Sequence, residues 1–201
     1  MASIPPPIDP VFLTKKQQVI NIVKAKNCTE AQFIQDNANT REELVEMLFE
    51  FSKTFDCDPK YLEDLLAPFT DAELTAYGIY YNKTGITITN PKVLIKCLNC
   101  IVNINAGGSI KEINICDQST ITSINIQNNT ILGLLNIGGG SIVDVLSIMP
   151  GSCIDVLLIK ACNSFNSELK KVTDNSCIKN ISIDDDAVYG GYECVINTSS
   201  V

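Results

Sequence analysis

The chain has 201 residues, of which 45% are hydrophobic, and its net charge is −8. This length suits one medium-sized domain or two small ones, and the hydrophobic share argues against disorder over most of the chain. The acidic balance argues against a nucleic-acid partner, which needs a basic face, and no apolar run approaches the roughly 20 residues of a membrane span.

The first residues form a proline-rich arm. Three consecutive prolines in SIPPPIDPVFL hold the backbone extended, so residues 1–12 are predicted to be an extended segment. A stiffened, extended segment loses little entropy when it docks onto another protein, although a loose tail fits the same composition. The candidate partner-binding residues are Pro5, Pro6, Pro7, Ile8 and Phe12.

A series of helix signals follows in residues 13–84. The first helix is expected to be capped by Thr14. Thr40 and Thr70 each stand three residues before a glutamate and predict capping boxes, and Asp58-Pro59 predicts a cap followed by proline at the first helical position. We expect four or five short helices that form a small bundle and attach the chain to other proteins.

Residues 110–159 repeat every 11 residues. Each unit carries apolar residues at its first, fourth and sixth positions and is preceded by a small residue, as at Gly108, Ser119 and Ser141. The fourth and sixth positions are two apart and so face the same side of a strand, while the first points inward before a bend. The residues predicted to form this core are Ile110, Ile113, Ile115, Ile121, Ile124, Ile126, Leu132, Leu135, Ile137, Val143, Leu146, Ile148, Ile154, Leu157 and Ile159.

Each unit is one strand and one turn, and stacked units bury a continuous core that no single unit could form. A β-solenoid with about 22 residues per coil is favoured over an antiparallel meander, which would not need an inward corner residue in every unit. The expected fold class is α+β and multidomain, with a small N-terminal helical bundle followed by a β-solenoid over residues 85–201. Residues 187–201 are expected to close its open end or to carry a receptor contact.

The stretch ITSINIQNNTI, residues 121–131, resembles the leucine-rich-repeat pattern L-x-x-L-x-L-x-x-N-x-L. The resemblance is closest to flattened bacterial forms in which both arms are strands, and it covers residues 99–186. Asparagine stands at the ladder position only once, at Asn129, and no helical convex segment is predicted. The resemblance therefore implies a flattened solenoid and does not imply a horseshoe with helices.

The sequence contains few candidates for reactive chemistry. It has no histidine, which removes the commonest general base and zinc ligand, so we expect no enzyme, cofactor or metal. Cys97-x-x-Cys100 is interpreted as a pair of core or corner cysteines rather than a redox or zinc site. The acidic run at 184–186 is interpreted as a solvated turn rather than a calcium site, and Gly138-Gly139-Gly140 as a turn.

Asp144 and Asp155 share a column of the repeat but are expected on opposite arms, which weakens a glycosidase interpretation. The start of the chain lacks the features of a signal peptide, so the nine cysteines are expected to remain reduced thiols in a cytoplasm.

In organisation and composition the chain resembles bacteriophage virion proteins such as head and tail fibres, which join an attachment domain to a β-rich distal domain. The resemblance implies a structural or adhesion role in a virion assembled in the host cytoplasm. It also implies binding of other virion proteins through residues 1–84 and a homo-oligomer, in first place a trimer. The alternatives are a cytoplasmic leucine-rich-repeat-like interaction module and, third, a polysaccharide-cleaving β-helix enzyme.

Overall fold

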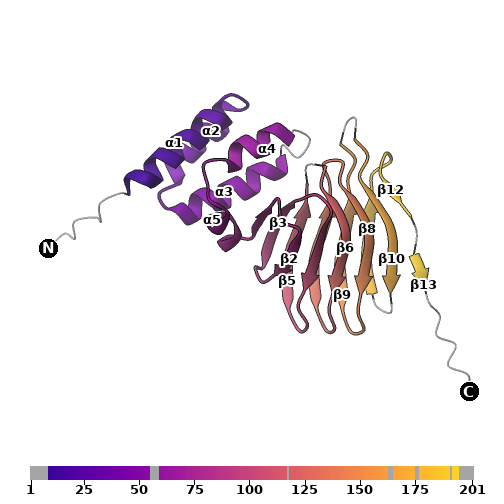
Figure 1. The fold of residues 1–201 in the computed structure, drawn as a ribbon. Coiled ribbons are helices and arrows are strands. Elements are labelled where there is room, and N and C mark those ends of the chain that lie inside the picture. Colours follow the sequence, from indigo (N-terminus) through magenta and orange to yellow (C-terminus); the bar gives the residue numbers. More distant parts are fainter. Residues whose placement is uncertain are drawn as a thin grey trace, which may run out of the picture.

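The computed structural model describes residues 9–54, 59–116, 118–162, 165–174, 177–190 and 192–194, which form a helical head and a stack of strands (Figure 1). The helices are α1 (Pro10–Lys24), α2 (Cys28–Asn37), α3 (Arg41–Thr54), α4 (Pro59–Leu66) and α5 (Asp71–Ala76). The strands are β1 (Ile79–Tyr81), β2 (Gly85–Ile88), β3 (Lys92–Lys96), β4 (Cys100–Ile104), β5 (Ser109–Ile115), β6 (Thr120–Ile126), β7 (Ile131–Ile137), β8 (Ile142–Ile148), β9 (Cys153–Ile159), β10 (Glu168–Asp174), β11 (Cys177–Ile183), β12 (Val188–Tyr189) and β13 (Tyr192–Cys194).

The first helix begins earlier than expected. Pro10 occupies the first turn of α1, and the carboxylate of Asp9 accepts a hydrogen bond from the N–H of Val11 at 2.9 Å. Thr14 lies inside the helix, where its hydroxyl donates to the carbonyl of Pro10. The helix therefore starts at Pro10 rather than after residue 12, because an aspartate cap followed by proline starts a helix. Asp58, the expected cap before Pro59, lies outside the described residues.

The other helix starts follow local capping chemistry. The capping boxes of α3 and α5 are confirmed: the N–H of Glu43 donates to the hydroxyl of Thr40, and Thr70 and Glu73 bond reciprocally in the same way. The cap of α2 is Asn27, whose side-chain oxygen accepts from two backbone N–H groups of the first turn.

The strands form two parallel sheets that share one core, and the predicted α+β fold with a β-solenoid is confirmed. Sheet A has the order β1-β3-β5-β7-β9-β11, and sheet B has the order β12-β10-β8-β6-β4-β2, with β13 also on β10. Every pair of neighbouring strands is parallel, and residues 22 apart, such as Ile115 and Ile137, lie side by side. This excludes the antiparallel meander. The first strand begins at Ile79, six residues before the expected boundary.

All fifteen residues of the three repeat columns lie in one buried cluster between the sheets. The inward and outward positions follow the sequence pattern, with two outward residues between the first and second column. Burial of this many isoleucine and leucine side chains supplies the main stabilisation of the solenoid, at about 25 cal/mol per Å² of apolar surface.

The small residues at the corners are buried and hydrogen-bond from coil to coil. The hydroxyl of Ser119 accepts from the N–H of Cys97 at 3.2 Å, and the hydroxyl of Ser141 accepts from the N–H of Ser119 at 3.2 Å. At the opposite corner, the hydroxyl of Ser152 accepts from the N–H of Thr130 at 3.0 Å. These contacts satisfy backbone groups that the bends take out of the sheet ladders.

Outward-facing asparagines form short ladders between coils. The side-chain amide of Asn125 donates to that of Asn103 on sheet B, and the amide of Asn136 donates to that of Asn114 on sheet A, both at 3.0 Å. The two asparagines on sheet A are buried, at 2% and 8% exposed. These asparagines thus bond to the matching residue of the neighbouring coil.

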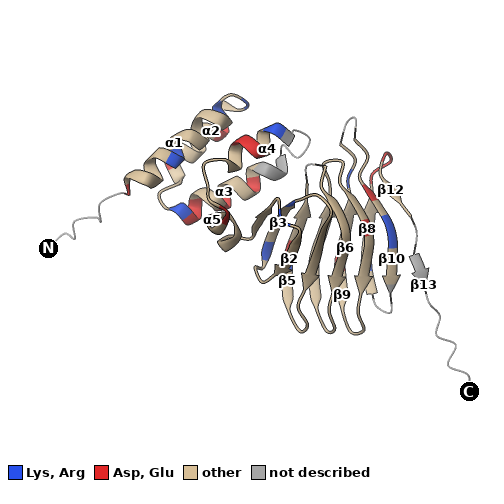
Figure 2. Ribbon diagram, viewed as in Figure 1, with Lys and Arg blue, Asp and Glu red and all other residues tan. Residues whose placement is uncertain are grey.

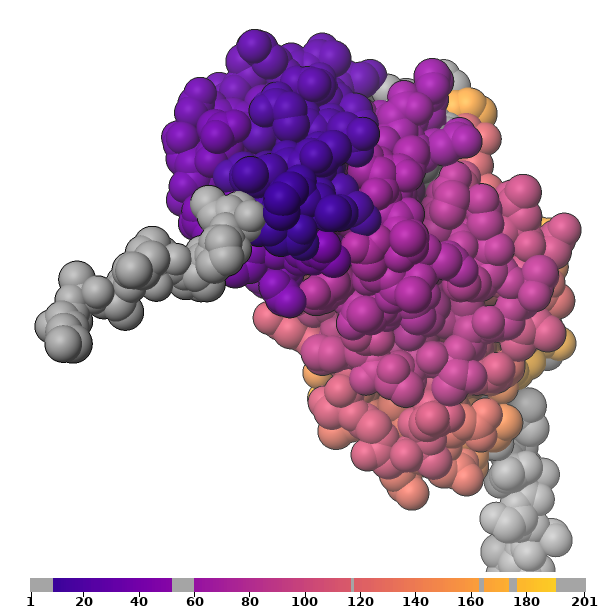
Figure 3. Space-filling model, turned by 60° about the vertical axis from the view of Figure 1, so that its left-hand side comes forward, coloured from indigo at the N-terminus to yellow at the C-terminus, as the bar shows by residue number. Residues whose placement is uncertain are grey.

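The helical head packs onto the outer face of the first strands of sheet A (Figures 1 and 3). Lys92 on β3 lies 3.6 Å from a carboxylate oxygen of Glu50 and 3.8 Å from one of Glu46, both on α3. The apolar residues of this junction are Val45, Phe49, Leu62, Leu66, Leu74, Ile79, Leu94 and Cys116. Head and solenoid are therefore joined through a buried apolar contact.

Candidate functional site

The head presents a groove along the seam between α1 and α4. Two shallow hollows of about 420 Å³ and 460 Å³ share Ile22 and Asp64 in their walls, and together they are called the α1–α4 groove. The remaining wall residues are Gln18, Asn21, Ala25, Lys26, Lys60, Tyr61, Ala67 and Pro68.

The groove combines an apolar floor with a charged rim. The ring of Tyr61 is buried, and the ammonium of Lys26 lies over it, 5.8 Å from the ring centroid. Lys60 pairs with Asp64 at 2.9 Å on the exposed face of α4. An apolar strip bordered by lysines suits a protein segment that brings an apolar side chain and a carboxylate.

Asp9, the first described residue, belongs to a cluster of ion pairs. Arg41 pairs with Asp9 at the root of the arm and lies 3.4 Å from Glu73. Lys15 also pairs with Glu73, at 2.7 Å. The cluster ties the starts of α1, α3 and α5 together and so holds Asp9 in place.

The candidate arm residues separate into two groups. Phe12 is only 5% exposed and belongs to the core of the head, so its side chain packs within its own chain. Pro5, Pro6, Pro7 and Ile8 lie outside the described residues. Lys16 of α1 is also buried: its ammonium donates to the carbonyls of Gln35 and Ala38 and so caps the end of α2.

The pKa of Glu73 is lowered to about 2, first by the hydrogen bond from Lys15 and then by those from the N–H and hydroxyl of Thr70. The folded-state pKa lies below the ordinary 4.5, so this carboxylate stabilises the head above about pH 4.5 and the stabilisation is lost as pH falls towards 2. We expect Glu73→Gln to lower the free energy of unfolding at pH 7 by about 2 kcal/mol and to flatten its dependence between pH 5 and pH 2. Urea unfolding followed by helical circular dichroism measures both. Glu63→Gln, at an exposed position of α4, is the control. If Glu73→Gln unfolded with the same pH dependence as the unsubstituted protein, the lowered pKa of Glu73 would not be a source of stability.

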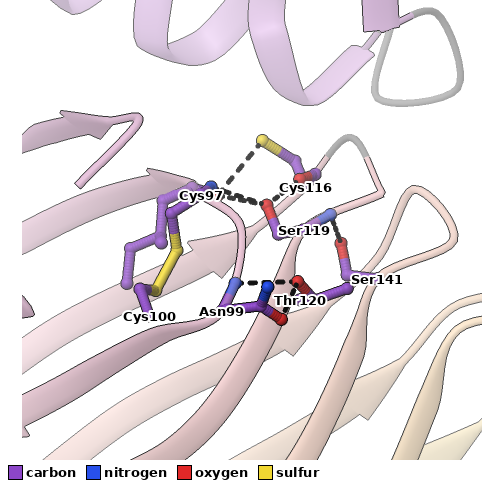
Figure 4. The surroundings of a disulfide bond; sticks show 8 residues. Cys97, Asn99, Cys100, Cys116, Ser119, Thr120 and Ser141 are labelled. Atoms are coloured by element: carbon purple, nitrogen blue, oxygen red, sulfur yellow. Dashed lines mark hydrogen bonds between the residues drawn. A yellow bond between two sulfur atoms is a disulfide. The ribbon is translucent and has the colours of Figure 1, made fainter. Parts of the chain in front are cut away.

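The CxxC pair lies at the corner between β3 and β4 (Figure 4). Cys97 and Cys100 are fully buried and joined by a disulfide, and Cys97 occupies the corner place that Ser119 takes in the next coil. A second disulfide joins Cys153 on β9 to Cys177 on β11. The expectation that the cysteines remain reduced is therefore wrong for these residues, since their pairing depends on contacts between coils that the sequence does not display.

The acidic residues and the glycine run that were considered as functional sites instead form ion pairs, a hydrogen bond and a turn. Asp144 lies on β8 and Asp155 on β9, in opposite sheets as predicted, and each pairs with a lysine of the next coil, at 2.8 Å and 2.7 Å. Asp184 accepts from the N–H of Ala161 at the turn that follows β11. Gly139 and Gly140 have φ of 60° and 73° and form the predicted turn between β7 and β8.

Within the described part of the chain, no group of three or more histidine, cysteine, aspartate or glutamate side chains is placed to hold a metal ion. None of the described helices has the length and apolar character needed to cross a membrane. The chain matches no protein-family model, no curated protein and no solved structure.

Proposed function

We propose that this protein is a non-enzymatic structural or adhesion protein, a component of a bacteriophage virion such as a head or tail fibre. The helical head anchors the chain to a neighbouring virion protein through the α1–α4 groove and the arm, and the solenoid serves as a stiff spacer. The observation that carries the proposal is the bonding of polar groups from coil to coil, at the corners and in the asparagine ladders. Such bonding suits a rigid stack better than a variable recognition surface.

The disulfides support a particle over a cytoplasmic module. Disulfide bonds persist in oxidising surroundings, which include virion surfaces, and are rare in proteins that stay in the cytosol. Cys153–Cys177 fastens the last strand of sheet A to its neighbour, where a particle exposed outside the cell benefits from added resistance to unfolding.

The proposal is tested by finding where the protein resides. Particles are purified from infected host cultures on a density gradient, and the protein is quantified by mass spectrometry against the major particle proteins. Co-purification at a fixed ratio supports the virion role. Recovery only in the soluble fraction, bound to one host protein, would favour the alternative, an intracellular leucine-rich-repeat-like interaction module.

The groove is tested with charge reversal at its rim. Lys26→Glu with Lys60→Glu is expected to reduce incorporation into particles at least tenfold, because both lysines border the proposed contact and are exposed. Lys111→Glu, an exposed position on β5 of the solenoid, is the control and should incorporate normally. If the double variant and the Lys111→Glu control were incorporated equally, the α1–α4 groove would not be the attachment site.

A further inference from the structure

Sheet A ends at β11, whose second edge pairs with none of the described strands. The backbone N–H and C=O groups along such an edge are a template for another strand. Sheet B ends on the same side of the solenoid with β12 and β13, which continue the register of β10. The two terminal strands therefore form an open end.

The open end exposes residues that are core residues everywhere else in the stack. Ile181 and Ile183 stand beside Leu157 and Ile159 of β9, in the same inward columns. Leu157 and Ile159 are fully buried, whereas Ile181 is 43% and Ile183 39% exposed. An apolar end of this kind gains stability when a further coil covers it.

The sequence of β11 complements itself about Ser182. In an antiparallel pair of two β11 strands centred on Ser182, Ile181 of one copy lies opposite Ile183 of the other, and both remain on the inward face. The same register brings Lys179, which pairs with Asp155 of its own chain, near the acidic turn at 184–186 that follows β11 of the second copy. Lys179 is exposed, as is the acidic turn at 184–186, which Figure 2 shows in red beside β12. Opposite charges therefore come together at the rim of the paired strands.

Sheet B offers the same symmetry. Tyr189 and Tyr192 occupy the register positions of the inward residues Leu169 and Val172. A centre midway between them places each tyrosine position opposite the other in a second copy.

We propose that the open end is the contact of a homodimer, in which two solenoids stack end to end about a two-fold axis through Ser182. Each copy supplies the same surface, as an isologous contact requires. The paired β11 strands bury Ile181 and Ile183 and remove the free edge of sheet A. The dimer contact does not depend on the proposed function, because it could form in a virion protein or in an interaction module. The proposed contact produces a dimer, whereas the resemblance to phage fibres implies a trimer.

Cross-linking on the axis tests the register. In a Cys28→Ser background, which removes an exposed thiol, Ser182→Cys is expected to give a disulfide-linked dimer under mild oxidation. Residues that face each other across antiparallel strands have Cα atoms about 4.5–5.5 Å apart, within the range that a disulfide spans. Asn180→Cys is the matched control, because its two copies would be about 13 Å apart. Equal cross-linking of both variants, or of neither, would overturn the register.

Light scattering after size exclusion tests the contact itself. The full chain is expected to have twice the mass of one chain, and Ile181→Lys with Ile183→Lys should make it monomeric while it stays folded. Ile131→Lys, at a position 51% exposed on β7, should remain dimeric. Lys179→Glu should weaken the dimer, and Lys179→Glu with Asp185→Lys should restore it. A monomeric full chain, whether or not its last residues cover the edge, overturns the proposal, as does a trimer that Ile181→Lys with Ile183→Lys leaves intact.

Discussion

Replacing Ile137 by aspartate is expected to abolish soluble folding. Ile137 is fully buried on β7, between Ile115 and Ile159 of the neighbouring coils. A carboxylate at this place has no partner and must either stay charged in an apolar core or bind a proton. Either outcome costs more than the roughly 4–5 kcal/mol that marks the most damaging substitutions.

Expression yield, sedimentation of the cell extract and thermal melting measure the effect. Ile131→Asp is the matched control, because Ile131 lies at the start of the same strand but is 51% exposed on its outer face. This variant should be soluble and melt within a few degrees of the unsubstituted protein. Normal yield and melting of Ile137→Asp would contradict the packing of the solenoid core.

Ser119→Ala is expected to lower the free energy of unfolding by about 2–3 kcal/mol. The fully buried hydroxyl accepts from the N–H of Cys97 and donates to the carbonyl of Cys116 at 2.5 Å. The substitution removes both bonds and leaves two buried backbone groups without this partner. For a chain of this size the melting temperature should fall by roughly 5–10 °C.

Ser147→Ala is the control for the corner hydroxyl. Ser147 lies at an outward, partly exposed position of β8, where loss of the hydroxyl should change stability by less than about 0.5 kcal/mol. If Ser119→Ala proved as mild as Ser147→Ala, the corner hydroxyls would be small spacers only, and the hydrogen bonds between coils would not stabilise the stack.

The repeat could be predicted because its physical signal is local and periodic. A spacing of three and two residues within each 11-residue unit determines which side chains face inward, and identical spacing in successive units implies stacking. Strand β1 and the early coils could not be predicted in the same way. They are short, and β4 meets β6 with an irregularity between Cys100 and Ile101 that interrupts the period.

Two features of the head have a local signal in the sequence. Asp9-Pro10 has the same capping pattern as Asp58-Pro59, but the neighbouring prolines favoured an extended interpretation. Lys16 is four residues from Phe12 and three from Val19, and so falls on the apolar face of α1. Its partners are carbonyls at the end of α2, which no spacing within α1 reveals.

The disulfide between Cys153 and Cys177 and the α1–α4 groove depend on contacts between distant segments. Cys153 and Cys177 are 24 residues apart and meet because β9 and β11 are aligned in that register. The groove exists because α4 returns to pack beside α1. Neither follows from composition or periodicity, since both require the path of the chain between the elements.

The measurement that tests the central claim most directly is intramolecular cross-linking between outward positions one coil apart. Asn103→Cys with Asn125→Cys places two thiols on adjacent parallel strands of sheet B, and mass spectrometry should find them linked after mild oxidation. Asn125→Cys with Asn136→Cys places them on opposite sheets, where no link should form. A link across 22 residues and none across 11 is the result that the solenoid predicts. A link between positions 125 and 136 would contradict the two-sheeted coil.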